Sequence, residues 1–185
     1  MPSPEQMVES IETALHKAGI DMNVTLYRMY GEGRSAGFEL VLPSTNEVLF
    51  TMDMDVNRPI QQTRLYEIAG LRFRGISPSQ ILADKIAAIS TNKVFRRIKD
   101  VVDLYYLSKV FPFERDDLMQ TLHDSGRHLE NFDGFLHRSD DLKHAYEKFR
   151  VTGDVRKPDF DEVYVTVKAY IKPILPKERR REMER

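Results

Sequence analysis

The chain has 185 residues, 41% of them hydrophobic and 31% charged, which is enough for one domain, or one domain with a helical extension, around a sizeable core. Its 28 basic and 29 acidic residues leave a net charge of −1, which disfavours nonspecific nucleic-acid binding through bulk positive charge. The sequence contains no cysteine, which excludes disulfide frameworks, zinc ribbons, iron–sulfur clusters and thiol nucleophiles.

Neither a signal peptide nor a membrane span is visible in the sequence. The first 19 residues are polar and amphipathic, without the continuous apolar stretch of a secretory signal. No apolar run approaches the roughly 20 residues that cross a bilayer. We therefore expect a cytoplasmic protein.

The first part of the chain predicts one helix followed by strands. Over residues 4–18 the apolar residues recur at spacings of three and four, with Ser3, Pro4 and Gln6 as the helix start and Gly19 as its end. Strands are predicted over residues 23–30, 37–42, 47–56 and 72–76, separated by turn residues. These segments predict a small, mostly antiparallel sheet.

From Ser77 onward the apolar residues follow the helical period. The sequence Ser77-Pro78-Ser79-Gln80 has the form of a capping box and predicts a helix that runs to about Ser90. Further helices are predicted over residues 94–110, 115–124, 139–150 and 159–171. The chain is therefore expected to have an α+β fold, with a sheet part over residues 1–76 and a helical bundle over residues 77–185.

The strand over residues 47–56 carries the first candidate site. Its even-numbered residues are apolar, whereas Asp53 and Asp55 share the opposite face at a separation of about 6–7 Å. Two such carboxylates can hold Mg²⁺, which neutralises developing charge in phosphoryl transfer. The alternative is the solvent-facing side of a half-buried strand. Aspartate is disfavoured in strands, which slightly favours a functional role.

A lysine and two aspartates mark the next two predicted helices. Lys85 lies within the apolar stripe that includes Ile81 and Ile89, so its ammonium must reach solvent, a carboxylate or a ligand phosphate. Asp100 and Asp103 follow on the next helix. They form either surface ion pairs, such as that of Lys99 with Asp103 at i,i+4, or an inward contact that fixes Lys85 or Arg97.

The segments LADKIAA, residues 82–88, and RIKDVVDLYYL, residues 97–107, resemble the nucleotidyltransferase toxins of the AbiEii/AbiGii type, the toxin halves of abortive-infection toxin–antitoxin pairs. In that family a lysine on an alanine-rich helix precedes an arginine and then Lys-Asp-x-x-Asp-Leu-Tyr. The matching residues are Lys85, Arg97, Lys99, Asp100, Asp103, Leu104 and Tyr105. The resemblance covers roughly residues 48–110.

This resemblance implies a nucleotidyltransferase-like fold in which carboxylates hold Mg²⁺ around a nucleoside triphosphate. It identifies Asp55 as the third-carboxylate residue, with Asp53 as the alternative, and both as metal ligands. The residues expected to bind the nucleotide are Lys85, Arg97, Lys99 and Asp100, and Asp103 is expected to support the catalytic site.

The sequence departs from the family at its first motif. The family's active site opens with a Gly-Ser turn and an Asp-x-Asp strand, and nothing ahead of Asp53 supplies them; the turn over residues 31–37 has no Asp-x-Asp at the right distance. The resemblance therefore implies a missing N-terminal quarter: the chain is a fragment, a natural remnant, or a component whose other half is a separate polypeptide. Two of three catalytic carboxylates are then absent, so metal-dependent transfer is not expected from this chain alone.

Two functional hypotheses follow. The first is a nucleotidyltransferase-like protein, incomplete or inactive here, that takes a nucleoside triphosphate and Mg²⁺, with a cognate antitoxin or a separate N-terminal half as partner and an uncertain nucleic-acid acceptor. The second is a non-catalytic protein-interaction module that keeps the fold. The first requires the carboxylates near Asp55 and the Lys85 amine to converge on one cleft.

Overall fold

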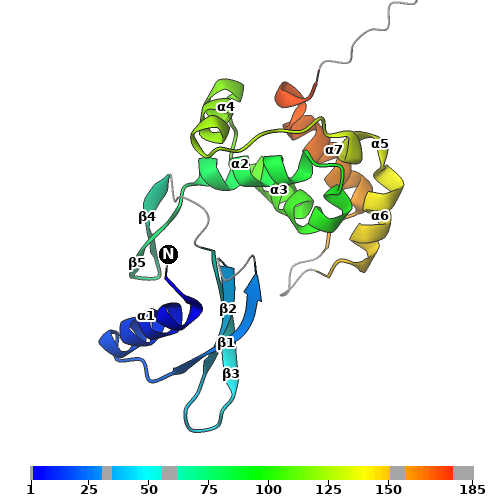
Figure 1. Ribbon diagram of the computed structural model, residues 1–185. Coiled ribbons are helices and arrows are strands. Elements are labelled where there is room, and N and C mark those ends of the chain that lie inside the picture. Colours follow the sequence, from blue (N-terminus) through cyan, green and yellow to red (C-terminus); the bar gives the residue numbers. More distant parts are fainter. Residues whose placement is uncertain (1, 31–34, 56–61, 151–156, 177–185) are drawn as a thin grey trace, which may run out of the picture. The chain divides into compact units, whose positions relative to one another are not determined.

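The computed structural model describes residues 2–30, 35–55, 62–150 and 157–176, without the side chains of Tyr30 and Asp55. The chain divides into two compact units, Met1–Pro59 and Ile60–Arg185. Helices and small antiparallel sheets are both present, so the predicted α+β class is confirmed (Figure 1). We call the first unit the sheet unit and the second the helical unit.

The sheet unit begins with helix α1, Pro4–Lys17. Its start is a capping box: the backbone N–H of Gln6 donates to the Ser3 hydroxyl over 3.3 Å, and the backbone N–H of Ser3 donates to Gln6 Oε1 over 2.8 Å. Gly19, with a φ of 72°, follows the end of the helix in the left-handed conformation that favours glycine. Both predicted helix signals are therefore confirmed.

Three strands complete the sheet unit: β1 (Asn23–Tyr30), β2 (Ser35–Val41) and β3 (Val48–Asp55). They form an antiparallel sheet with β2 in the centre. One face of the sheet packs against α1 around a small core of Met7, Ile11, Met22, Val24, Ala36, Phe38 and Leu40 (Figure 1). Met52 and Met54 pack against this core, so Asp53, between them, lies on the opposite face, as the alternation predicts.

The helical unit opens with a hairpin of β4 (Thr63–Ile68) and β5 (Leu71–Ile76). The predicted strand over residues 72–76 pairs with β4, which the sequence patterns did not identify, in a sheet separate from β1–β3. The two residues of the turn, Ala69 and Gly70, have φ angles of 50° and 80°, typical of a tight hairpin turn. Adjacent apolar residues Leu65 and Tyr66 interrupt the alternation that would have revealed β4.

The helices follow in the order α2 (Pro78–Ile89), η2 (Val94–Arg97), α3 (Ile98–Val110), α4 (Arg115–Asp124), α5 (Asp133–His137), α6 (Ser139–Lys148), α7 (Phe160–Tyr170) and η3 (Lys172–Ile174). The Ser77 hydroxyl accepts the backbone N–H of Gln80, which confirms the predicted start of α2. The helix predicted over residues 94–110 is divided between a 3₁₀ turn and α3. Helix α5 was not predicted because five residues are too few to show a helical period.

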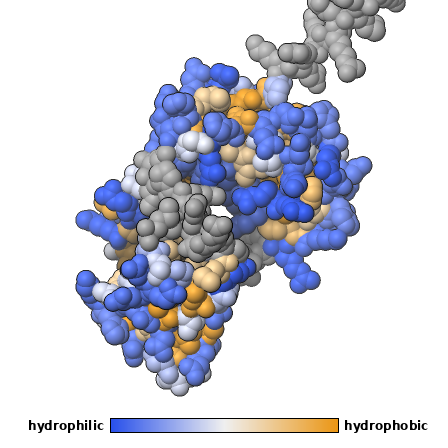
Figure 2. Space-filling model, in the orientation of Figure 1, coloured by the Kyte–Doolittle hydropathy of each residue, from blue (hydrophilic) through white to orange (hydrophobic). Residues whose placement is uncertain are grey.

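Helix α2 lies at the centre of the helical core. Its residues Leu82, Ala83, Ile86 and Ile89 are almost completely buried, and they belong to one cluster with apolar residues from α3, α4, α6 and α7. Much of the surface of this unit seen in Figure 2 is hydrophilic. Among the described residues, no helix combines the length and apolar character that a membrane crossing needs.

Candidate functional site

The centre of the candidate site is the ammonium of Lys85. Although it lies in the apolar stripe of α2, its side chain is 21% exposed and reaches α3. Its Nζ donates to Asp103 Oδ2 over 2.5 Å and to Asp100 Oδ1 over 3.4 Å. Lys85 therefore joins the two helices through carboxylates that lie 15 and 18 residues further along the chain.

Asp100 is the most buried charged group of this site, with a side chain that is 13% exposed. Its second oxygen, Oδ2, forms an ion pair with Arg97, whose Nε lies 2.8 Å away. The interpretation that an α3 aspartate turns inward to fix Lys85 or Arg97 is thus confirmed, and Asp100 contacts both. We call Lys85, Arg97, Asp100 and Asp103 the lysine cluster.

The lysine cluster is balanced in charge, with two cations and two carboxylates. Such a pairing lowers the cost of burying each charge, since an unpaired buried ion is strongly unfavourable. An ammonium has three N–H donors, and the described contacts of Lys85 to carboxylates use two of them. The Lys85 ammonium is therefore a positioned cation within a neutral cluster, and one of its N–H groups lies outside these contacts.

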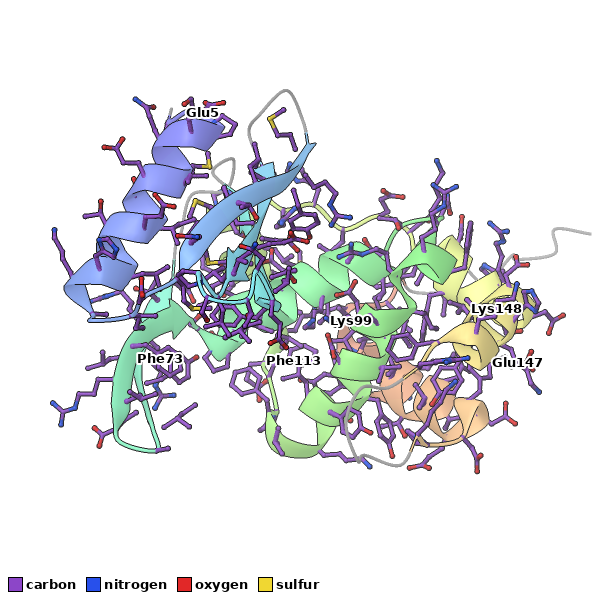
Figure 3. The ribbon with its side chains drawn as sticks, turned by 90° about the horizontal axis from the view of Figure 1, so that it is seen from below. Glu5, Phe73, Lys99, Phe113, Glu147 and Lys148 are labelled. Atoms are coloured by element: carbon purple, nitrogen blue, oxygen red, sulfur yellow. The ribbon has the colours of Figure 1, made fainter. Side chains whose placement is uncertain are left out.

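Lys99 occupies a different position from Lys85. It is exposed on α3, where it is labelled in Figure 3. The ion pair with Asp103 that the i,i+4 spacing allows is not among the described contacts, and Asp103 binds Lys85. Lys99 therefore lies beside the lysine cluster in sequence without an ion pair to its carboxylates in the described structure.

Asp53 lies on the face of β3 opposite the small core. Its side chain is 70% exposed, and its Oδ1 lies 4.0 Å from an Arg28 guanidinium nitrogen. Its cross-strand neighbour is Gly37 of β2. Asp55 ends β3, and its side chain lies outside the described part of the structure. Asp53 and Lys85 belong to separate units, so their convergence on one cleft stays a prediction.

The two carboxylates of β3, Asp53 and Asp55, can be compared with the ligands that a metal ion requires. The described residues include no group of three or more histidine, cysteine, aspartate or glutamate side chains that could hold a metal ion. Mg²⁺, however, is commonly held by one or two carboxylates together with substrate phosphates and water. By residue type, Asp53 and Asp55 could supply the two carboxylates. They would not form a complete metal site without phosphate and water ligands.

A second polar contact joins α3 to α7. The Tyr105 hydroxyl donates to Glu162, and Lys109 Nζ donates to the same hydroxyl over 2.5 Å. The hydrogen bond to Tyr105 raises the pKa of Lys109. Sequence reasoning matched Tyr105 to the motif but missed Glu162, which lies 57 residues away and leaves no local signal.

Burial affects two tyrosines that help to hold α7 in place. The Tyr170 hydroxyl donates to the carbonyl oxygen of Phe111 over 2.5 Å, and the Tyr146 hydroxyl donates to that of Pro158. Burial raises the pKa of each phenol to about 12. Both phenols are therefore neutral hydrogen-bond donors at physiological pH, which suits a structural role.

Comparison with known proteins gives one family. The family model described as "Nucleotidyl transferase AbiEii toxin, Type IV TA system" matches residues 4–166, which include α1, both sheets and most of the helices. No curated protein and no solved structure matches the chain.

Proposed function

This chain belongs to the AbiEii family of nucleotidyl transferase toxins of type IV toxin–antitoxin systems, and on that premise we propose that it binds a nucleoside triphosphate through the lysine cluster. The observation that carries the proposal is the position of Lys85, whose ammonium is held between Asp100 and Asp103. A lysine fixed in this way is a positioned point charge of the kind that phosphate groups bind.

Each member of the lysine cluster has a distinct part in this proposal. Lys85 donates to a phosphate oxygen, with Arg97 as a second cation whose guanidinium is half-exposed. Asp100 and Asp103 are positioning residues, because they hold the cations rather than touch the nucleotide. Lys99, exposed on the same helix, adds positive charge that attracts the triphosphate without a fixed contact.

We propose Mg²⁺ as the metal that accompanies the nucleotide, with Asp53 and Asp55 as its protein ligands. The ion would neutralise negative charge on the phosphates. The Gly-Ser turn and the further Asp-x-Asp strand have no counterpart in the sequence. We therefore propose binding without nucleotidyl transfer by this chain alone; a cognate antitoxin is the partner that membership of a toxin–antitoxin family implies.

Isothermal calorimetry with ATP, GTP, CTP and UTP, each with and without Mg²⁺, tests this function. We expect at least one magnesium–nucleotide complex to bind, and we expect the paired substitution Asp53→Asn and Asp55→Asn to reduce the effect of Mg²⁺. A labelled nucleotide incubated with the chain and total RNA should show no transfer. Absence of binding for all four nucleotides would overturn the proposal, and transfer by the isolated chain would overturn its second part.

A second candidate function, a non-catalytic interaction module, is favoured by the β4–β5 hairpin. Leu65, Ile68 and Leu71 are each at least 60% exposed there, and exposed apolar groups of this kind often mark a protein-binding surface. Co-purification with the cognate antitoxin tests this alternative. The substitution Leu71→Ser should reduce recovery of the antitoxin, whereas Val165→Ser, at a similarly exposed position of α7, should not.

A further inference from the structure

A cavity separate from the lysine cluster lies within the helical unit, between α2, the loop that follows α3, and α4. Its volume is about 220 Å³. Pockets for drug-sized ligands usually occupy about 300–1,000 Å³, so this one suits a single side chain better than a whole nucleotide. We call it the α4 pocket.

The floor and part of the wall of the α4 pocket are apolar and held in place. Leu82 and Leu118 on its floor are almost completely buried. Phe111 and Phe113 form the aromatic part of the wall; Phe113 is labelled in Figure 3. Tyr170 supports both, through its hydrogen bond to the Phe111 carbonyl and an edge-to-face contact with the Phe113 ring at 5.1 Å. The pocket is therefore formed without a ligand.

Two carboxylates, Glu114 and Asp117, also line the α4 pocket and are exposed to solvent. Neither has an ion pair in the described part of the chain, whereas Asp116 in the same turn pairs with Arg115 over 3.3 Å. The helix dipole favours acidic residues at the start of α4, but it does not explain why two of them line an apolar cavity. Their charge repels phosphate and attracts a cation.

We propose that the α4 pocket binds an arginine side chain from a peptide segment of a partner protein. The guanidinium is planar and carries five donors, enough for both carboxylates at once. Its aliphatic stem would cover the leucine floor, and a cation lying over Phe111 or Phe113 gains a further attraction from the ring. An arginine side chain therefore matches the α4 pocket in size, in its contact with the apolar wall and in its charge.

Calorimetry with a pentapeptide that carries one arginine between leucines tests this proposal on the full chain. The control peptide has citrulline, a neutral group of nearly the same shape, in place of arginine. We expect citrulline to weaken binding about tenfold or more, because charge-assisted hydrogen bonds are lost. The paired substitution Glu114→Gln and Asp117→Asn should weaken binding of the arginine peptide by a similar factor, whereas Asp116→Asn should leave it unchanged.

Equal binding of the two peptides, or an unchanged affinity after the paired substitution, would overturn the proposal. Equally tight binding of free arginine amide would overturn its assignment to a peptide and indicate a site for small cations. The three substituted residues are exposed, and circular dichroism checks that each variant stays folded. No nucleotide is present, so the result is independent of nucleotide binding by the lysine cluster.

Discussion

The lysine cluster of the helical unit and the aspartate face of the sheet unit hold their charges in opposite ways. Asp100 is mostly buried and contacts two cations, whereas Asp53 is mostly exposed and has one guanidinium at 4.0 Å. Buried ion pairs are strongly destabilised when one partner is removed, and exposed pairs are not. The proposed nucleotide-binding residues are therefore coupled to folding in the first region, whereas the proposed metal ligands of the second region are separable from it.

The largest effect is expected for Asp100→Ala. This change leaves the half-exposed Arg97 without its carboxylate and Lys85 with Asp103 alone, and it should lower the free energy of unfolding by about 1.5–3 kcal/mol, the range for contacts with charged groups. Urea denaturation of the full chain, followed by circular dichroism, measures it. A loss below about 1 kcal/mol, near that of an exposed pair, would remove the contrast between the two regions.

A matched pair of glycine substitutions compares packing in the two units. A Cβ at Gly134 would lie 2.8 Å from the Asn92 carbonyl oxygen, a backbone atom, whereas at Gly37 it would meet the ring of Tyr27 at 2.6 Å. The Tyr27 side chain is partly exposed and can move aside. Gly134→Ala should therefore cost about 1–3 kcal/mol of stability and Gly37→Ala less. A larger loss of thermal stability for Gly37→Ala than for Gly134→Ala would contradict this interpretation of the packing.

The capping box of α1 is expected to make an intermediate contribution to the free energy of unfolding. Ser3→Ala removes the acceptor for the Gln6 N–H and should destabilise the sheet unit by about 1 kcal/mol. Ser10→Ala, an exposed hydroxyl inside the same helix, is the control and should be neutral or slightly stabilising. Denaturation curves that shift equally for both variants would show that the cap does not matter.

The smallest effect is expected for Asp53→Asn. Because its contact with Arg28 is long and exposed, stability should change by less than about 0.5 kcal/mol. Thermal unfolding at low and high salt measures this change. A larger loss that salt does not reduce would mean that Asp53 supports the fold, which would weaken its assignment as a metal ligand.

Local sequence signals were sufficient for most of the fold. The capping residues Ser3 and Ser77 fixed the starts of α1 and α2, and periodicity predicted α4 with its observed bounds. Strand β4 was not predicted because its apolar and polar residues do not alternate. Helix α5 was not predicted because it is too short to show a helical period.

The candidate site was predictable only in part. The position of Lys85 in an apolar stripe left solvent, a carboxylate or a ligand phosphate open, and Asp100 or Asp103 was one interpretation; in the structure both aspartates bind Lys85. Glu162 beside Tyr105 was missed because the two residues lie 57 positions apart in the chain. Contacts at such separations depend on helix packing, which a single sequence does not specify.

The most direct test compares magnesium–nucleotide binding by Lys85→Met with that by Lys93→Met, which removes an exposed lysine outside the lysine cluster. Lys85→Arg, which keeps the charge, serves as a second variant in case Lys85→Met fails to fold. We predict that Lys85→Met weakens calorimetric binding by about tenfold or more, the loss of one charge-assisted contact, while Lys93→Met binds like the unaltered chain. Equal affinity for the two methionine variants would contradict the proposal that Lys85 binds the triphosphate.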